Sequence, residues 1–196
     1  MTANLYLGAD IFRIVGATDI PATVAEVFGI VQATNFPERA EAIADSIMKR
    51  RPHVIGLQEV SLYRSKSYIP GSEYVTEYDF LQLLMNALAA RGLDYRVAGE
   101  VTNADVEAPM VIDEPPYLQG LRLTDRDVIL VRKDVHPGTP IAGNYSTNAY
   151  FDLGGSTVYF TRGYVMVPVT VGGRSYLFVN SHLETRLNSD SPFGIV

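Results

Sequence analysis

The sequence contains no cysteine among its 196 residues. Without cysteine the chain has no disulfide framework, no thiolate metal site and no cysteine nucleophile. An excess of positive charge is also missing, because 16 basic residues stand against 22 acidic ones and give a net charge of −6. There is no basic run of the kind that neutralises a phosphate backbone, so strong non-specific binding to nucleic acid is disfavoured.

Two targeting features are absent from the sequence as well. No apolar run is long enough to span a bilayer, so we expect no transmembrane segment. The N-terminus lacks the basic start and apolar core of a signal peptide, and the chain begins almost directly on a strand-like segment. The compartment therefore stays open, and it includes secretion if a natural leader is missing from the N-terminus.

The composition that remains is typical of a globular protein. Hydrophobic residues make up 47% and charged residues 19%, which excludes a disordered chain. A length of 196 residues suits one domain with a substantial core. No repeat, linker or low-complexity segment stands out, so we predict a single domain over residues 1–196.

Helical patterns dominate the first half of the chain. A first helix is predicted to begin near Pro21, and a second opens at Asn35 and ends before Pro52. A third is predicted over residues 78–91, where Gly92 follows as a natural terminator. Short strand patterns lie between these helices, which indicates a mixed α/β chain.

The rest of the chain divides into polar segments and strands. Residues 61–77 and 103–124 are polar and contain prolines, so both are predicted to be loops. The segment 127–132 is a strand pattern, and residues 158–182 alternate as a long hairpin around Gly172 and Gly173.

One strand ends in a way that needs explanation. Residues 54–60 form an apolar run that carries Gln58 and Glu59 near its end. A buried strand rarely ends in an ionisable side chain unless that side chain has a partner. Glu59 is therefore either an edge carboxylate, paired with an arginine or capping a loop, or a metal-ligand or catalytic carboxylate.

Two other strand patterns end in polar side chains in the same way. Asn4 follows the first strand-like residues, and His182 follows the return strand of the hairpin. If these strands lie side by side, Asn4, Glu59 and His182 meet at one edge of a sheet. A carboxylate there suits a hard cation such as Mg²⁺, and an imidazole suits a phosphoryl oxygen.

These segments resemble successive motifs of the endonuclease/exonuclease/phosphatase superfamily. The resemblance rests on residues 2–5, 52–60 and 179–183, and residues 126–132 are similar to the family's central strand. It implies an α+β fold, a four-layer α/β sandwich in which two mostly antiparallel sheets are flanked by helices. It also implies phosphoester hydrolysis that depends on Mg²⁺ or Mn²⁺.

The resemblance assigns roles residue by residue. Asn4 and His182 match catalytic positions, and Glu59 matches the metal-binding glutamate. Further candidates for phosphate or site-edge contacts are Asp10, Gln58 and Arg162.

Two other segments are interpreted beside these candidates. Residues 9–34 look like an insertion after the first motif. In residues 125–127, one charge near the site is the alternative, and a local pair between Arg126 and an aspartate is the favoured interpretation.

The chain also departs from the family pattern. The family has a later Gly-Asp-x-Asn segment and a final Ser-Asp-His segment, and neither follows His182. We therefore expect an N-terminal part of a longer domain, incomplete at its C-terminus, with half a catalytic site and little or no activity. Unpaired strand edges and exposed core would make the isolated chain prone to aggregation.

Two functions stay open at this level. The first is phosphoester hydrolysis on a small phosphoester, a phospholipid headgroup or a nucleic acid, by a protein expected to be monomeric if complete. The acidic balance favours the smaller substrates. The alternative is a non-catalytic α/β binding domain that uses the loops 61–77 and 103–124.

Overall fold

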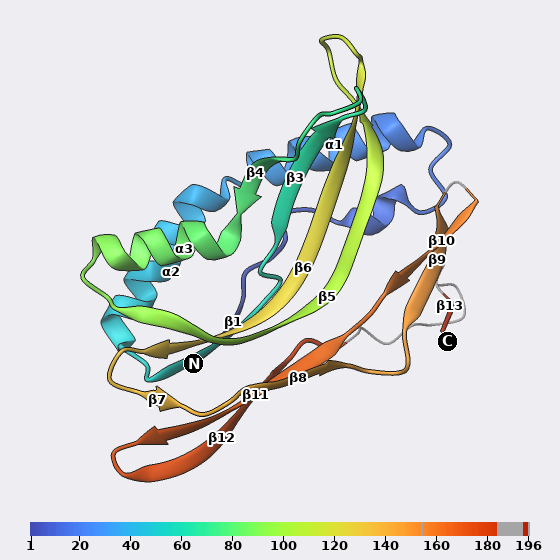
Figure 1. The fold of residues 1–196 in the computed structure, drawn as a ribbon. Coiled ribbons are helices and arrows are strands. Elements are labelled where there is room, and N and C mark those ends of the chain that lie inside the picture. The colour runs from blue at the N-terminus through green and yellow to red at the C-terminus, as the bar shows by residue number, and fades with distance from the viewer. Residues whose placement is uncertain (154, 184–193, 196) are drawn as a thin grey trace.

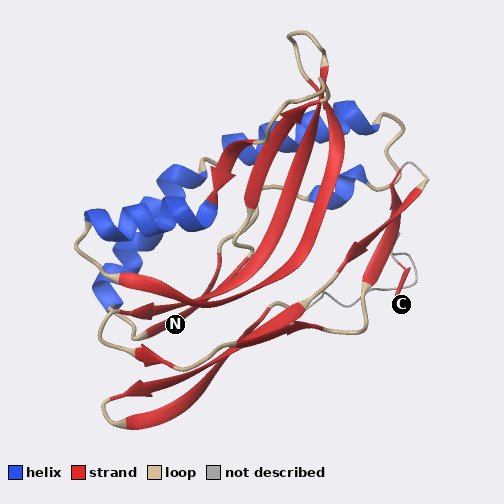
Figure 2. Cartoon of the chain, viewed as in Figure 1, coloured by secondary structure: helices blue, strands red, loops and turns tan. Residues whose placement is uncertain are grey.

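The computed structural model describes residues 1–153, 155–183 and 194–195. Helices cover one face of a six-stranded sheet, and a smaller antiparallel sheet lies across the other face (Figure 1). The mixed α/β fold with mostly antiparallel sheets packed face to face is thereby confirmed, and a third, smaller sheet is present as well. The three α-helices of the described residues lie on the larger sheet (Figure 2), whereas the short helical turn at Ile11–Ile14 also packs towards Phe151 and Phe160 of a smaller sheet.

The larger sheet has the strand order β1-β2-β6-β3-β4, and β5 pairs with the other side of β6. Its strands are β1 (Thr2–Asn4), β2 (Val54–Gln58), β3 (Leu62–Ser67), β4 (Val75–Asp79), β5 (Tyr95–Val111) and β6 (Leu118–Arg132). β1 runs parallel to β2, whereas the other pairs are antiparallel.

Two smaller sheets follow in the chain. The first contains β7 (His136–Pro137), β8 (Ile141–Asn144), β11 (Gly163–Val171) and β12 (Arg174–Ser181). The second contains β9 (Ala149–Leu153), β10 (Ser156–Phe160) and β13 (Gly194–Ile195). Gly172 and Gly173 join β11 to β12 with φ of 56° and 75°, so the predicted two-residue hairpin turn is confirmed.

The three predicted helices are confirmed as α1 (Ile20–Ala33), α2 (Phe36–Arg50) and α3 (Phe80–Ala90), and a short 3-10 helix, η1 (Ile11–Ile14), precedes them. Asp19 caps α1 by accepting the N–H of Ala22 at 3.0 Å. Asp79 caps α3 by accepting the N–H of Leu81 at 3.1 Å. None of the described helices is long and apolar enough to cross a membrane.

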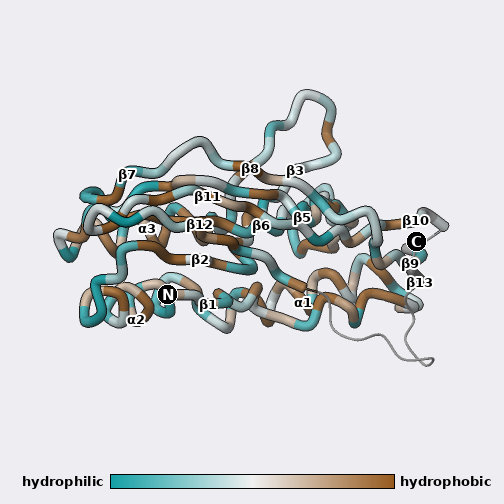
Figure 3. Tube along the Cα trace, turned by 90° about the horizontal axis from the view of Figure 1, so that it is seen from below, coloured by the Kyte–Doolittle hydropathy of each residue, from teal (hydrophilic) through white to brown (hydrophobic). Residues whose placement is uncertain are grey.

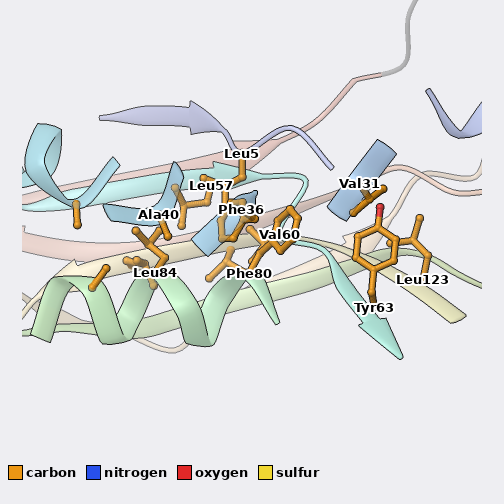
Figure 4. Packing of buried hydrophobic residues seen from close by; sticks show 14 of the residues in the cluster. Leu5, Val31, Phe36, Ala40, Leu57, Val60, Tyr63, Phe80, Leu84 and Leu123 are labelled. Carbon is orange, nitrogen blue, oxygen red and sulfur yellow. The ribbon is translucent and has the colours of Figure 1, made fainter. Parts of the chain in front are cut away.

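The main core lies between the helices and the larger sheet (Figure 4). Phe36 of α2 stacks on Phe80 of α3 with ring centroids 3.6 Å apart, and both side chains are fully buried. A second core of valine and isoleucine side chains, including Ile129 and Val167, joins the two facing sheets. Figure 3 shows these hydrophobic positions along the helices and central strands.

The prediction of loops at residues 61–77 and 103–124 is wrong. β3 and most of β4 occupy the first segment, while β5 and β6 occupy most of the second. The polar residues of these strands form cross-strand pairs on an exposed face, such as Arg122 with Asp105. The composition of the strands is therefore as polar as that of a loop. Pro109 is tolerated because β5 lies at an edge of the sheet.

Candidate functional site

Asn4 and Glu59 meet where β1 and β2 end. The register pairs Asn4 with Gln58, so Glu59 follows directly beyond the paired residues. The Nδ2 of Asn4 donates to Oε1 of Glu59 at 2.7 Å, and the N–H of Leu7 donates to Oε2 at 2.6 Å. Both carboxylate oxygens are therefore fixed in direction before any ligand arrives.

The backbone at this point lies in a conformation that L-residues rarely adopt. Glu59 has φ of 54° and Tyr6 has φ of 55°. The left-handed conformation costs a non-glycine residue about 1–2 kcal/mol. Such strain persists only where the surroundings enforce it, and it is concentrated at functional sites.

Two side chains hold the segment that donates to Glu59. Arg39 donates to the carbonyl of Leu5 at 2.6 Å and to that of Tyr6 at 3.1 Å. The hydroxyl of Tyr63 donates to the carbonyl of Leu7 at 2.9 Å. Burial raises the pKa of Tyr63, so this hydroxyl stays a neutral donor.

His182 reaches the same place from the facing sheet. Its Nε2 lies 3.9 Å from Oε1 of Glu59, just beyond the end of β12. The expectation of three strands side by side is therefore wrong for His182, because β12 belongs to the smaller sheet. The three predicted residues nevertheless come together, across the two sheets and not along one edge.

Arg162 lies beside His182 and fixes its tautomer. Nη1 of Arg162 lies 3.3 Å from Nδ1 of His182. A guanidinium has only donors, so Nδ1 accepts and the proton of a neutral imidazole lies on Nε2, facing Glu59. The same Nη1 is 3.7 Å from a carboxylate oxygen of Asp125.

Asp125 and Asp127 form a buried acidic pair on β6, whereas the favoured sequence interpretation placed one of them in a local pair with Arg126. They are 4% and 0% exposed. Burial and the neighbouring charge of Asp127 raise the pKa of Asp125 to about 7, against the opposing effect of Arg162. Burial also raises the pKa of Asp127, and neither of its carboxylate oxygens makes a hydrogen bond of normal geometry.

The predicted local pair between Arg126 and an adjacent aspartate is wrong. Arg126 points to the other face of the strand and forms an ion pair with Asp79 at 2.9 Å. Asp125 and Asp127 are two residues apart, which places them on one face of β6. That spacing is the sequence signal by which the acidic pair is recognisable.

Gln58 lies away from the other candidates. Its Nε2 donates to Asn180 at 2.5 Å and to Thr2 at 3.0 Å. Asn180 donates in turn to the carbonyls of Leu57 and Val128. The Gln58–Asn180 pair therefore joins the two sheets, and the structure gives Gln58 no contact at the edge of the site.

A cleft of about 740 Å³, part of it open to solvent, lies beside Glu59. Its lining residues are Tyr6, Leu7, Ala9, Asp10, Ile11, Phe12, Glu59, Leu123, Asp125, Phe160, Arg162 and His182. Asp10 lies at this cleft and also caps η1, by accepting the N–H of Phe12 at 3.0 Å. Within residues 1–153, 155–183 and 194–195, no three histidine, aspartate or glutamate side chains are grouped to hold a metal ion.

Two solved structures are similar to this chain. An endonuclease/exonuclease/phosphatase family protein from Leptotrichia buccalis C-1013-b has 14% identity and a TM-score of 0.45, over 81% of this chain and 52% of its own. Truncated Caenorhabditis elegans TDP2 has 14% identity and a TM-score of 0.37, over 78% of this chain and 42% of its own. This chain therefore spans about half the length of either structure. No family model and no curated protein matches the sequence.

Proposed function

We propose that this chain supplies the cation- and phosphate-binding part of a site that hydrolyses phosphoesters. The observation that carries the proposal is the Glu59 carboxylate, held by Asn4 and Leu7 on a strained backbone at the edge of a cleft. Preorganised carboxylates of this kind suit a hard cation. At 14% identity and TM-scores below 0.5, the two similar structures assign no residue roles, so the roles proposed here come from the chain's own side chains.

The donor set fits Mg²⁺ or Mn²⁺. Mg²⁺ keeps several waters and is bound by one or two carboxylates together with substrate phosphate, so a cage of three protein carboxylates is not required. Glu59 would hold the cation, Asn4 would orient the carboxylate, and Asp10 lies at the same cleft. When bound, the cation would polarise the phosphoryl oxygen and lower the pKa of a bound water.

Arg162 and His182 would bind the phosphate. Both line the cleft, and Nε2 of His182 faces Glu59 with its proton available for donation. A guanidinium and an imidazole together donate to a phosphoryl oxygen, and the donation strengthens as negative charge develops there. Arg162 also neutralises Asp125, which would otherwise repel an anionic substrate.

Asp125 is the candidate for proton transfer. A carboxyl group whose pKa is raised to about 7 accepts a proton from water far better near neutral pH than an ordinary aspartate does. It lines the cleft that contains Glu59 and His182. The two oxygens of Asp127 lie buried on the same face of β6 and would add to the negative charge that favours a cation.

The binding-domain alternative loses its main support. It relied on loops over 61–77 and 103–124, and strands occupy most of both segments. The net charge of −6 favours a small phosphoester or a phospholipid headgroup over long nucleic acid as the substrate.

The test is calorimetric titration of the purified chain with inorganic phosphate, with and without Mg²⁺ or Mn²⁺. We expect phosphate binding that requires the cation and weakens at least tenfold in Glu59→Gln, because this change removes the charge and keeps the shape. Glu100→Gln, at an exposed position of β5, is the matched control and should bind as the native chain does. Binding that ignores both the cation and Glu59→Gln would contradict the proposal.

Turnover is a separate measurement. Neither later motif of the family that the sequence resembles follows His182 in residues 183–196, so we expect residues 1–196 to hydrolyse bis(p-nitrophenyl) phosphate at or near background. Rapid turnover that Glu59→Gln abolishes would support the site and contradict the expected inactivity of this chain.

A further inference from the structure

A second, apolar cavity adjoins the cleft. Its empty volume is about 590 Å³, which includes space open to solvent, so only part of it is enclosed. The cavity lies between η1, α1, the β5–β6 pair and the β9–β10 hairpin. Its lining residues are Ile11, Ile14, Val24, Val27, Phe28, Val31, Tyr63, Val106, Glu107, Ala108, Leu121, Leu123, Phe151, Val158 and Phe160.

The cavity and the cleft share a wall. Ile11, Leu123 and Phe160 line both. The ring of Phe160 packs against Phe12, which lines the cleft, and against Phe151, which lines the cavity, with centroids 5.5 Å apart in each case. A ligand with a polar and an apolar end therefore has adjacent places for both.

The polar groups of the cavity are already engaged. The hydroxyl of Tyr63 donates to the carbonyl of Leu7. The carboxylate of Glu107 accepts from the hydroxyl of Tyr74. A nucleobase placed here would lose its hydrogen bonds to water without replacement, which is costly, whereas an alkyl chain has none to lose.

We propose that this cavity binds the alkyl chain of an amphiphilic phosphodiester whose phosphate lies in the cleft beside Glu59, Arg162 and His182. The inference rests on the proposed function and names its substrate class. The residues that create the cavity come partly from segment 9–34, the stretch that looks like an insertion, and partly from the β9–β10 hairpin. Each buried methylene should raise the affinity about fourfold, so chain length should control affinity strongly.

The test compares three ligands by calorimetry in the presence of Mg²⁺. Dodecylphosphocholine, kept below its micelle concentration, carries both parts. Glycerophosphocholine carries only the phosphodiester, and dodecyl maltoside carries only the chain. We expect dodecylphosphocholine to bind at least tenfold more tightly than either of the others.

Substitutions in and away from the cavity test where the alkyl chain of dodecylphosphocholine binds. Ala108→Leu fills the cavity and should weaken dodecylphosphocholine at least tenfold while leaving glycerophosphocholine unchanged. Ala108→Val is a milder filling that should give a smaller loss and guards against misfolding of the leucine variant. Ala142→Leu, at an exposed position of β8, is the matched control, and Leu177→Ser removes exposed apolar surface on β12. Neither change should alter the affinity for dodecylphosphocholine.

The outcomes separate this inference from the proposed function. If glycerophosphocholine and phosphate bind through Glu59 but dodecylphosphocholine binds no better, the alkyl-chain inference fails and the proposed function stands. If neither of these two tailless ligands binds, the proposed function fails. Equal affinity for dodecyl maltoside, or loss of binding in Leu177→Ser instead of Ala108→Leu, would overturn the inference.

Discussion

The single carboxylate of Glu59 and the buried pair Asp125 and Asp127 lie in different environments at this site. Glu59 stands at the end of β2 with both oxygens hydrogen bonded, on a backbone with φ of 54°. Asp125 and Asp127 stand within β6, buried, and three of their four oxygens make no hydrogen bond of normal geometry. Hydrogen bonds from neighbouring residues orient Glu59, whereas burial of Asp125 and Asp127 costs them hydration that hydrogen bonds replace only in part.

The two environments suit Glu59 and the Asp125–Asp127 pair to different chemical roles. Both oxygens of Glu59 are fixed in direction by hydrogen bonds before a ligand arrives, which suits cation binding. Asp125 has a pKa raised to about 7, so it exchanges a proton near neutral pH. A bound cation would relieve the desolvation cost of the buried pair, so ligand binding and stability should be coupled.

The largest expected effect comes from removing the support of Glu59. Arg39→Ala deletes donors to the carbonyls of Leu5, Tyr6 and Thr34, and a guanidinium that lies 4.9 Å above the ring of Phe36. We expect a loss of about 3 kcal/mol in the free energy of unfolding, measured by urea denaturation.

A surface arginine provides the control for this variant. Arg13→Ala removes an exposed ion pair with Glu26, which is worth about 0–1 kcal/mol. Equal losses in Arg39→Ala and Arg13→Ala would show that the segment before Leu7 needs no support.

The second effect concerns the buried acidic pair. The pKa of Asp125 rises from an ordinary 3.8 to about 7 on folding, so the folded state binds more protons between these pH values. Stability should therefore fall as the pH rises through this window. Asp125→Asn should flatten this dependence and raise stability at pH 8 by about 2 kcal/mol.

An aspartate with the opposite shift serves as the control. The pKa of Asp134 is lowered to about 2 by its hydrogen bond with Arg132, so Asp134→Asn should give no gain at pH 8. Thermal unfolding across pH 4 to 8 measures both variants. An Asp125→Asn profile with the slope of the native chain would remove Asp125 from the account.

The smallest expected effect tests how far Asn4 orients the Glu59 carboxylate. Asn4→Ala removes the hydrogen bond to the Glu59 carboxylate and the acceptor of the Tyr6 N–H, and leaves the Glu59 side chain unchanged. We expect a loss of about 1.5 kcal/mol in stability, together with weaker cation binding. Asn148→Ala, on a loop before β9, is the control and should change neither. A stable Asn4→Ala variant with native cation affinity would mean that Leu7 alone orients Glu59.

The sequence predicted one half of the site better than the other for a physical reason. Asn4, Glu59 and His182 each follow an apolar run, and a polar side chain at such a point is conspicuous. Asp125 and Asp127 alternate with other residues inside a strand, where polar residues usually face water. Their burial depends on the facing sheet, which a local pattern does not reveal.

Local elements of the fold were also predicted better than elements that depend on distant partners. The helices were predicted because their caps and apolar spacing are local, as Asp19 illustrates. The strands β3 to β6 were taken in large part for loops because their stability comes from partners distant in sequence. Arg122 pairs with Asp105 only after β5 and β6 align.

The proposed function depends first of all on the claim that Glu59 holds a divalent cation next to His182. The chain has three histidines, so proton NMR resolves each imidazole separately. His53 precedes β2, about 20 Å along the strand from Glu59, and His136 lies on β7.

Substoichiometric Mn²⁺ should broaden the signals of His182 first, leave those of His53 and His136 sharp, and have no such selective effect in Glu59→Gln. Uniform broadening of all three histidines, or selective broadening that survives Glu59→Gln, would contradict the claim.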